Sequence, residues 1–282
     1  MLNQNSIVLI TGANSGIGKA TAIELAKTSA TIVMACRSLE RGKQAKSDIQ
    51  EASGSEKIDL MICDLGSMKS IREFCSLFRS KYPRLNVLIN NAAVILTGYH
   101  RTEDGFELQF GVNHLGHFLL TNELHDLIIK SAPARIINVS SGAHKFGAIH
   151  LDDIHLEKRF TFMRAYAQSK LANVLFTYHL AEKLAGTGVT VNCLHPGAVA
   201  TQLGINRENG FGRGLTRLLK PFFLTPETGA ETSIYLATSE EVSNITGKYF
   251  RNKKSVPSSK RSYDKEMAKK LWELSEKLTD SR

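Results

Sequence analysis

The sequence predicts an α/β fold, built as a doubly wound parallel sheet in one domain that spans residues 1–282. Short apolar runs rich in β-branched residues alternate along the chain with longer segments of helical period. Strands and helices in alternation form parallel sheets through right-handed crossovers, with helices on both faces. No internal linker and no low-complexity stretch interrupts this order, so we expect a single domain.

Each expected strand is apolar on both faces, which is typical of a sheet that helices cover on both sides. The expected strands span residues 6–11, 31–36, 58–63, 86–90, 134–140, 189–194 and 247–250. The segments between them carry apolar residues at helical spacing. The expected helices span about 17–29, 39–52, 67–81, 105–130, 164–186 and 227–238, and a basic helix follows at about 262–280.

The composition is that of an ordinary globular protein, with 42% hydrophobic and 22% charged residues. No apolar run reaches the ~18 residues that span a bilayer, and the first residues lack the pattern of a signal peptide. The four cysteines form no CxxC pair and lie in apolar patterns, so we expect reduced core thiols and no metal site. These features predict a cytoplasmic location.

The formal net charge of +9 is concentrated in residues 202–225 and 251–282. No nucleic-acid-binding motif accompanies these basic residues, so nucleic acid is not an expected partner, whereas an acidic cofactor fits the charge. The C-terminal helix has one apolar stripe, and we expect it to dock on the domain. A homo-oligomer contact and a weak membrane-surface contact are the alternatives for this stripe.

A glycine-rich turn, TGANSGIG at residues 11–18, joins the first strand to the first helix. Glycines at these places allow the turn, let a pyrophosphate approach the backbone and permit close helix packing. The N-terminus of the helix then offers free N–H groups and a positive dipole to phosphate. The turn predicts a dinucleotide site with contacts from Gly12, Asn14, Ser15, Gly16, Ile17 and Gly18.

The end of the second strand, MACRS, indicates which dinucleotide binds. NAD sites place Asp or Glu about 20 residues beyond the glycines, where the carboxylate bonds to the ribose 2′-hydroxyl. Cys36 and Arg37 occupy this place, and no acidic residue is there. Because the Arg37 guanidinium can clamp a 2′-phosphate bidentately, we expect NADP rather than NAD.

Tyr166 and Lys170 lie one helical turn apart in the segment RAYAQSKLANVLF. Inside a cleft, an ammonium near a phenol would lower the phenol pKa from about 10 toward neutrality. Tyr166 would then donate and accept a proton at physiological pH. The pair therefore predicts general acid–base chemistry.

Two long segments, 142–163 and 197–226, leave the carboxyl side of the sheet, where ligands bind in such folds. Segments of this length are usually binding loops or lids, and four glycines suit the second to a lid. Both segments are rich in apolar residues. Those of segment 142–163 include Phe146, Phe160, Phe162 and Met163. We therefore expect a pocket for a lipophilic aldehyde, ketone or alcohol.

Further motifs follow in a fixed order: Asp64, NNAA at 90–93, Asn113, Ser141, YxxxK at 166–170 and PGAVAT at 196–201. Together with the glycine-rich turn, this set resembles the short-chain dehydrogenase/reductase family over nearly the whole chain. The stretches EDGFELQFGVNHLGHFLLT and YAQSKLANVLFT are similar to its branch of retinol dehydrogenases and WW-domain oxidoreductases. Ala93 departs from the pattern, because the family usually has glycine there. The resemblance implies a Rossmann fold and hydride transfer between a nicotinamide and a carbonyl group or alcohol.

The family's catalytic residues fall on Asn113, Ser141, Tyr166 and Lys170 of this sequence. The resemblance implies that Tyr166 is the general acid and base, that Lys170 lowers its pKa and holds the ribose, and that Ser141 donates to the substrate oxygen. Ser140 is the alternative to Ser141. Asn113 would hold a water that connects Lys170 to solvent, or else be a polar residue that kinks its helix.

The resemblance also implies cofactor contacts beyond the glycine-rich turn. Asp64 would bond to the adenine amino group, Asn90 would line the ribose, and Val199 and Thr201 would hold the carboxamide. The other implied cofactor contacts are Leu65, Ala92, Tyr166, Lys170, Pro196 and Gly197.

The sequence thus predicts an NADP(H)-dependent oxidoreductase. A protein that binds a dinucleotide without turnover, as a sensor or scaffold, is the alternative, and the set of Ser141, Tyr166 and Lys170 argues against it. Three histidines, His114, His117 and His195, are expected to pack within the protein rather than to bind a metal or the cofactor.

Overall fold

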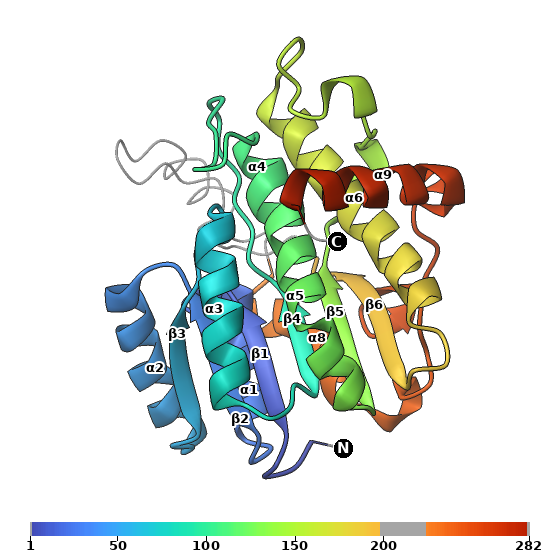
Figure 1. Cartoon of the computed structure of the whole chain (residues 1–282). Helices are drawn as coiled ribbons and strands as arrows, with labels where there is room; N and C mark the ends of the chain where they lie inside the picture. The colour runs from blue at the N-terminus through green and yellow to red at the C-terminus, as the bar shows by residue number, and fades with distance from the viewer. Residues whose placement is uncertain (1, 198–223, 281–282) are drawn as a thin grey trace.

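The computed structural model describes residues 2–197 and 224–280 and contains an eight-stranded sheet (Figure 1). The strand order is β3-β2-β1-β4-β5-β6-β7-β8, and every pair is parallel except β7 with β8. The order reverses between β1 and β4, which confirms the doubly wound topology. The strands are β1 (Ile7–Thr11), β2 (Thr31–Cys36), β3 (Ile58–Ile62), β4 (Val87–Asn90), β5 (Ala134–Val139), β6 (Val189–His195), β7 (Lys248–Arg251) and β8 (Lys254–Ser255).

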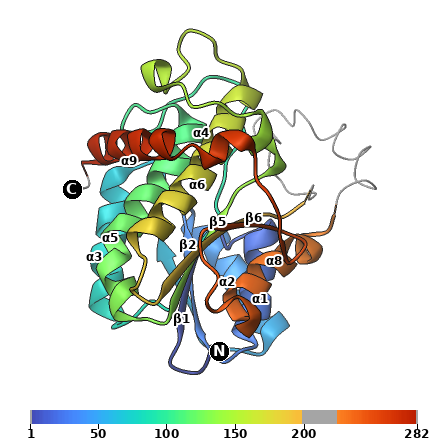
Figure 2. The ribbon, with the colours of Figure 1, turned by 90° about the vertical axis from the view of Figure 1, so that its right-hand side faces the viewer.

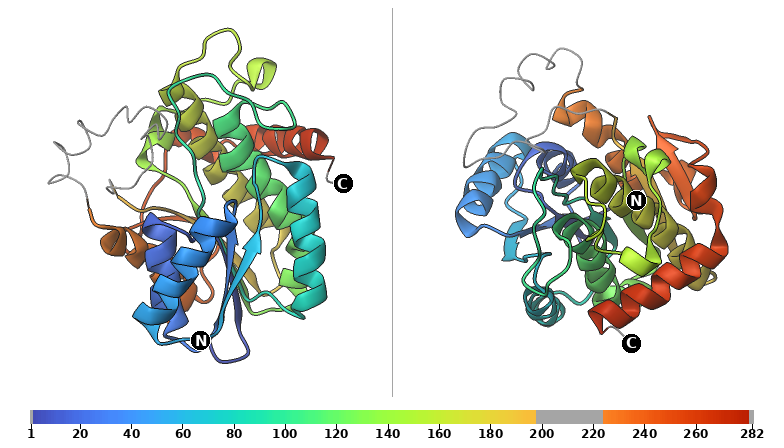
Figure 3. Two further views of the ribbon diagram at one scale, coloured as in Figure 1. Left: turned by 90° about the vertical axis from the view of Figure 1, so that its left-hand side faces the viewer. Right: turned by 90° about the horizontal axis from the view of Figure 1, so that it is seen from above.

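Helices cover both faces of the sheet. Figures 2 and 3 show α1, α2 and α8 on one side and α3, α5 and α6 on the other. Along β1 to β6 most apolar residues alternate between two buried clusters, one under each helical layer. The helices are α1 (Gly16–Ala26), α2 (Leu39–Ser53), α3 (Met68–Lys81), α4 (Leu108–Phe110), α5 (Gly116–Lys130), α6 (Phe162–Lys183), α8 (Pro226–Thr238) and α9 (Lys265–Thr279).

The helix expected at 105–130 is interrupted, because a π-helical segment, Gly111–Leu115, separates α4 from α5. Glycine at both borders of this segment permits close packing. A Cβ at Gly111 would collide with the Thr102 side chain, and a Cβ at Gly116 would collide with the Leu65 carbonyl oxygen. π-Helical turns recur at functional sites, and this one carries Asn113.

The C-terminal helix α9 lies across α5 and α6 (Figure 1). The Trp272 ring packs edge-on to Phe118, with 4.9 Å between centroids, and stacks on Phe176 at 5.8 Å. A guanidinium nitrogen of Arg72 donates to the Thr279 carbonyl oxygen at 2.6 Å. The apolar stripe of this helix is therefore buried against the domain.

Three observations complete the comparison of the fold with the sequence analysis. β8 was not predicted, because two residues are too few to show an apolar pattern. Among residues 2–197 and 224–280, no helix combines the length and apolar character needed to cross a bilayer. Most of the predicted lid, about 197–226, lies outside the described residues, as do Val199 and Thr201.

Candidate active site

A cleft of about 660 Å³ opens at the carboxyl ends of the strands. This volume is in the range of ligand sites, roughly 300–1,000 Å³. Its lining comes from the turn after β1, the ends of β2 and β3, the loop after β4 and the start of α6. Most of the predicted site residues line it: Gly12, Asn14, Ser15, Gly16, Ile17, Gly18, Arg37, Asp64, Leu65, Ala92, Tyr166, Lys170 and Pro196.

The glycine-rich turn has the geometry that a pyrophosphate site requires. Gly12 and Gly16 have positive φ angles of 68° and 55°, which only glycine adopts freely. A Cβ at Gly18 would collide with the Gly12 carbonyl oxygen, so this glycine lets α1 approach the turn. Ser15 precedes α1 without capping it through its side chain, and no acidic residue lies in the first turn. The helix N-terminus thus faces the cleft with N–H groups and a positive dipole available to an anion.

The end of β2 presents cations to the cleft. Arg37 is exposed and lines the cleft together with Ser38 and Arg41. Ser38 caps α2, since its hydroxyl oxygen accepts the Arg41 N–H at 3.3 Å. Arg41 was not predicted as a site residue, although its spacing of four from Arg37 at a helix start was a usable signal. The residues present here fit a phosphate and offer no carboxylate to a free ribose 2′-hydroxyl.

Asp64 and Asn90 differ in their access to the cleft. Asp64 is half-buried at the lining, and its Oδ1 accepts the Gly66 N–H at 2.9 Å. Asn90 is 2% exposed and is absent from the lining. Its amide nitrogen donates to Thr121 Oγ1 at 3.0 Å and to Asn138 Oδ1 at 2.8 Å. The Asn90 side chain thus braces β4 against β5 and α5, and the next residue, Asn91, lines the cleft, while the ribose contact of Asn90 stays a prediction.

Tyr166 and Lys170 line the cleft together with Ser140, whereas Ser141 is absent from the lining and contacts Tyr166. Lys170 is 1% exposed, and its Nζ lies 5.7 Å from the centre of the Tyr166 ring. This Nζ donates to the Val139 carbonyl oxygen at 3.0 Å. Ser141 hydrogen-bonds to Tyr166 through its side chain, whereas the Ser140 hydroxyl donates to the Lys170 carbonyl oxygen at 2.8 Å. The geometry therefore favours Ser141 over Ser140 as the partner of the phenol.

Burial dominates the titration of this pair. Burial raises the pKa of Tyr166 above its usual value, and the Ser141 hydrogen bond lowers it by a smaller amount. Burial also lowers the pKa of Lys170 to about 7. The expectation that Lys170 lowers the phenol pKa is not met in this structure. The physical reason is that the ammonium is itself desolvated, so its charge is only partly present near neutrality.

Asn113 is held entirely by protein groups. Its Oδ1 accepts the Val94 N–H at 2.8 Å, and its Nδ2 donates to the Val94 carbonyl oxygen at 3.0 Å and to Ser169 Oγ at 3.1 Å. Its own carbonyl oxygen accepts from Asn173 Nδ2 at 3.0 Å and from His117 Nδ1 at 3.1 Å. Asn113 thus ties the loop after β4 to α6, from a π-helical position, which favours the interpretation of a polar residue at a helix irregularity.

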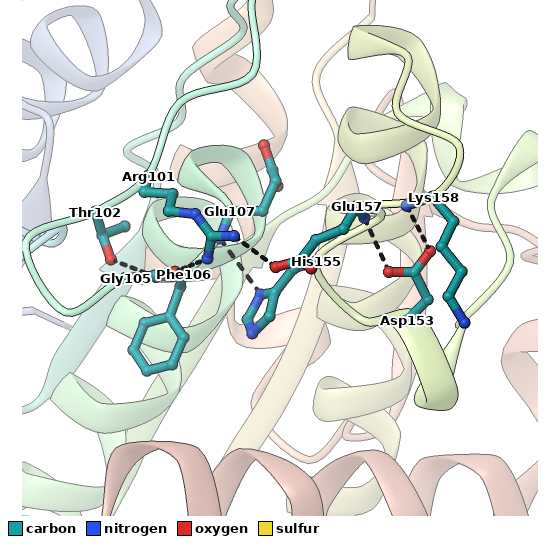
Figure 4. A network of polar contacts seen from close by, with 9 residues as sticks. All are labelled: Arg101, Thr102, Gly105, Phe106, Glu107, Asp153, His155, Glu157 and Lys158. Carbon is teal, nitrogen blue, oxygen red and sulfur yellow. Dashed lines mark hydrogen bonds and ion pairs between the residues drawn. The ribbon is translucent and has the colours of Figure 1, made fainter.

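The loop after β4 forms the wall of the cleft beyond Tyr166, and Figure 4 shows how it is held. Arg101 donates to the Gly105 carbonyl oxygen at 2.6 Å and forms an ion pair with Glu157. The Glu107 N–H donates to His155 Nδ1 at 3.3 Å. These contacts join the loop after β4 to the loop before α6. The apolar lining from this region is Val94, Ile95, Leu96, Leu108 and Val112.

The sequence comparisons agree with this geometry. The family model described as short chain dehydrogenase matches residues 6–210. Retinol dehydrogenase 14 of Homo sapiens is 45% identical, with 98% of this chain and 86% of that protein covered. Retinol dehydrogenase 13 of Homo sapiens is 46% identical, with 96% and 83% covered.

The chain belongs to the short-chain dehydrogenase family. Solved structures agree: a protein from Mycobacterium paratuberculosis has a TM-score of 0.78 at 33% identity, covering 99% of this chain and 95% of that one. The short chain dehydrogenase from Shigella flexneri, with a TM-score of 0.68 at 23% identity over 89% and 92%, shows the shared fold. The protein is thus an oxidoreductase that acts on CH–OH groups with NAD(P) as acceptor.

The predicted wall from residues 142–163 is absent from the described lining of the dehydrogenase cleft. Phe146 is 85% exposed, Met163 51% and Phe162 36%, while Phe160 packs edge-on to Tyr99. Gly197 is also absent from the lining. The described wall comes from residues 93–101, of which the sequence analysis had assigned only Ala93, at the end of the NNAA motif.

The discounted histidines are packed as expected in this dehydrogenase. His117 Nε2 lies 2.8 Å from Thr11 Oγ1, and His114 Nε2 lies 3.0 Å from Ser275 Oγ of α9. Burial lowers the pKa of His114 to about 4 and that of His117 to about 3, so both are neutral. His195 ends β6 and makes contacts with the backbone that the sequence did not indicate.

Proposed function

We propose that this short-chain dehydrogenase interconverts a lipophilic aldehyde or ketone and its alcohol, with NADP(H) as the hydride carrier. The observation that carries the proposal is one cleft lined by Arg37, Arg41 and Tyr166, whose phenol hydrogen-bonds to the Ser141 side chain. The relatives named retinol dehydrogenase act, by their names, on an apolar alcohol, which agrees with a lipophilic substrate.

The preference for NADP(H) rests on charge. Arg37 and Arg41 face the place where a 2′-phosphate of the adenosine ribose would lie, and charge-assisted bonds from guanidinium to phosphate are strong. NADH lacks this phosphate, and the cleft lining here holds no carboxylate to bind its 2′-hydroxyl. The α1 N-terminus would hold the pyrophosphate.

Tyr166 and Ser141 handle the proton and the oxygen charge. Bound NADPH supplies the hydride. Tyr166 donates its phenolic proton to the carbonyl oxygen during reduction and takes it back during oxidation. Ser141 donates a hydrogen bond to the same oxygen as negative charge develops on it. Lys170 would hold the ribose. Where the bound cofactor stabilises the charged form of Lys170, that positive charge favours the phenolate form of Tyr166.

The lipophilic substrate is supported by the wall after β4. Val94, Ile95, Leu96, Leu108 and Val112 present aliphatic side chains to the cleft. Burial of each substrate methylene against such a surface contributes about 0.8 kcal/mol. We therefore expect kcat/KM to rise several-fold for each methylene until the pocket is full.

The cytoplasmic location and the absence of a nucleic-acid partner stay predictions of the sequence.

The test is reduction of straight-chain aldehydes of increasing length by the purified protein, with NADPH and with NADH. The proposal expects kcat/KM to rise with chain length and to be higher with NADPH. A flat or falling dependence on length would contradict the lipophilic substrate, and a preference for NADH would contradict the cofactor. No turnover with any aldehyde, together with tight NADPH binding, would favour a dinucleotide-responsive binding protein.

A further inference from the structure

His195 is the last residue of β6 and lies between the loop that carries Gly142 and the loop that carries Gly197. Its Nδ1 accepts the Gly142 N–H at 3.2 Å and the Gly197 N–H at 3.3 Å. Gly142 directly follows Ser141, and Gly197 directly follows Pro196, which lines the cleft. One ring nitrogen therefore joins the loop that carries the substrate-side hydroxyl to the loop on the cofactor side.

The two bonds fix the protonation of the His195 ring. Because two N–H groups donate to Nδ1, this nitrogen carries no proton, and the neutral ring has its proton on Nε2. Burial, with smaller contributions from the neighbouring Arg251, His144 and Lys145, lowers the pKa of His195 to about 4. The acceptor at Nδ1 is therefore present throughout the neutral pH range.

A second histidine holds the other side of the same peptide group. His144 Nδ1 lies 2.6 Å from the Ser141 carbonyl oxygen, and its Nε2 accepts the Ser259 N–H at 3.1 Å. A carbonyl oxygen only accepts, so His144 donates from Nδ1 and has the tautomer opposite to that of His195. The C=O of Ser141 and the N–H of Gly142 belong to one peptide bond and point in opposite directions. The two rings therefore clamp this peptide plane from both sides.

The His195 ring also lies against the backbone that it binds. A Cβ at Gly142 would lie 3.3 Å from His195 Nε2, so a side chain there would press on the ring. Gly197 has a φ of 90°, a conformation that L residues rarely adopt. Both donors of the His195 contacts are thus glycines at positions where a side chain would be crowded or strained, and rotation of the Ser141–Gly142 peptide would break its hydrogen bonds to both histidines.

We propose that His195 is a positioning residue: its Nδ1 fixes the Ser141–Gly142 peptide and the Pro196–Gly197 loop relative to each other. The inference rests on the proposed function, since it assigns Ser141 to the substrate oxygen and the Pro196–Gly197 loop to the nicotinamide end of the cofactor. A misplacement of about 1 Å in such a site costs up to about 10²-fold in rate. The predicted effect is therefore on kcat, without loss of the fold.

The test compares His195→Asn with His195→Gln. Asparagine places an amide oxygen one bond from Cγ, where Nδ1 lies, whereas glutamine places it one bond further along. We expect His195→Gln to lower kcat at least about 10-fold with little change in the KM for the aldehyde. His195→Asn should recover turnover to within about 3-fold of the wild type. His125→Asn, on the exposed side of α5, is the matched control and should leave kcat unchanged.

A binding measurement separates this inference from the proposed function. We expect His195→Gln to weaken NADPH several-fold, measured by nicotinamide fluorescence, and to leave the affinity for 2′,5′-ADP unchanged, because that fragment lacks the nicotinamide end. Equal NADPH affinities and equal kcat values in His195→Gln and the wild type would overturn the inference. An equal loss in His195→Asn and His195→Gln would also overturn it, because the acceptor position would not be the cause. Failure of the wild type to reduce aldehydes would instead overturn the proposed function, and the two affinities would still decide the role of His195.

Discussion

At the scale of single residues, the site depends on groups whose protonation is set by burial. Lys170 is 1% exposed and its pKa is lowered to about 7, while the pKa of Tyr166 is raised by the same cause. The sequence predicted both residues, because their spacing of four on a helix can be read directly from the amino-acid sequence. It could not predict which effect dominates their pKa values, because burial depends on the loops packed around them.

Lys170 should make the stability of the protein depend on pH. An unfolded lysine keeps a pKa near its usual 10.5, so between pH 7 and about 10 the unfolded chain binds more protons than the folded one. The contribution of Lys170 to the free energy of unfolding therefore rises with pH in that window. Below it, the charged ammonium is buried in the folded protein, which destabilises the fold. Lys170→Met should have a higher free energy of unfolding than the wild type, and this difference should shrink with rising pH by up to about 1.4 kcal/mol per pH unit. Urea unfolding at pH 6, 8 and 10 measures it, and a pH-independent difference would contradict the depressed pKa.

Arg37→Asp should turn the cofactor preference toward NADH. The substitution removes a partner of the 2′-phosphate, adds a repelling charge and supplies an acceptor for a free 2′-hydroxyl. We expect the ratio of kcat/KM for NADPH to that for NADH to fall at least about 100-fold, which corresponds to about 3 kcal/mol. Arg84→Asp, which does not line the cleft, is the control. A ratio unchanged by Arg37→Asp would remove Arg37 from the cofactor site.

At the scale of elements, the strands and most helices follow the sequence pattern closely, and the departures have physical causes. The helix expected at 105–130 is broken because Gly111 and Gly116 pack against Thr102 and Leu65, which are distant contacts that periodicity does not contain. The loop 142–163 was predicted to face the substrate from its apolar content. In the described structure Phe160 packs edge-on to Tyr99 and Phe146 is exposed, because the contacts of a loop side chain are set by its neighbours in space.

The C-terminal helix should contribute strongly to stability. Trp272 is 6% exposed and packs on Phe118 of α5 and Phe176 of α6. Trp272→Ala removes these contacts and leaves a cavity, which typically costs about 3–5 kcal/mol. Leu77→Ala is the control, because Leu77 is 58% exposed and should change stability by less than about 0.5 kcal/mol. Equal midpoints of urea unfolding for the two variants would show that α9 does not brace the fold.

At the scale of the whole molecule, the topology explains why so much of the site was predictable. The carboxyl ends of parallel strands meet at one edge, so motifs that directly follow strands converge there. Gly12, Arg37, Asp64 and Ala92 all follow strands and all line the cleft. The substrate wall and the histidine contacts were not predictable, because they depend on how separate loops pack against each other, as Glu107 and His155 show.

The most direct test of the central claim is a single turnover of NADPH bound to the wild type and to Tyr166→Phe. The enzyme is mixed with NADPH and then with a long-chain aldehyde, and the loss of reduced-nicotinamide absorbance is followed. We predict that Tyr166→Phe binds NADPH as the wild type does but transfers hydride at least about 10²-fold more slowly, because no proton reaches the carbonyl oxygen. Tyr235→Phe, whose hydroxyl donates to Glu241 on an exposed surface, should match the wild type. Hydride transfer in Tyr166→Phe at the wild-type rate would contradict the account.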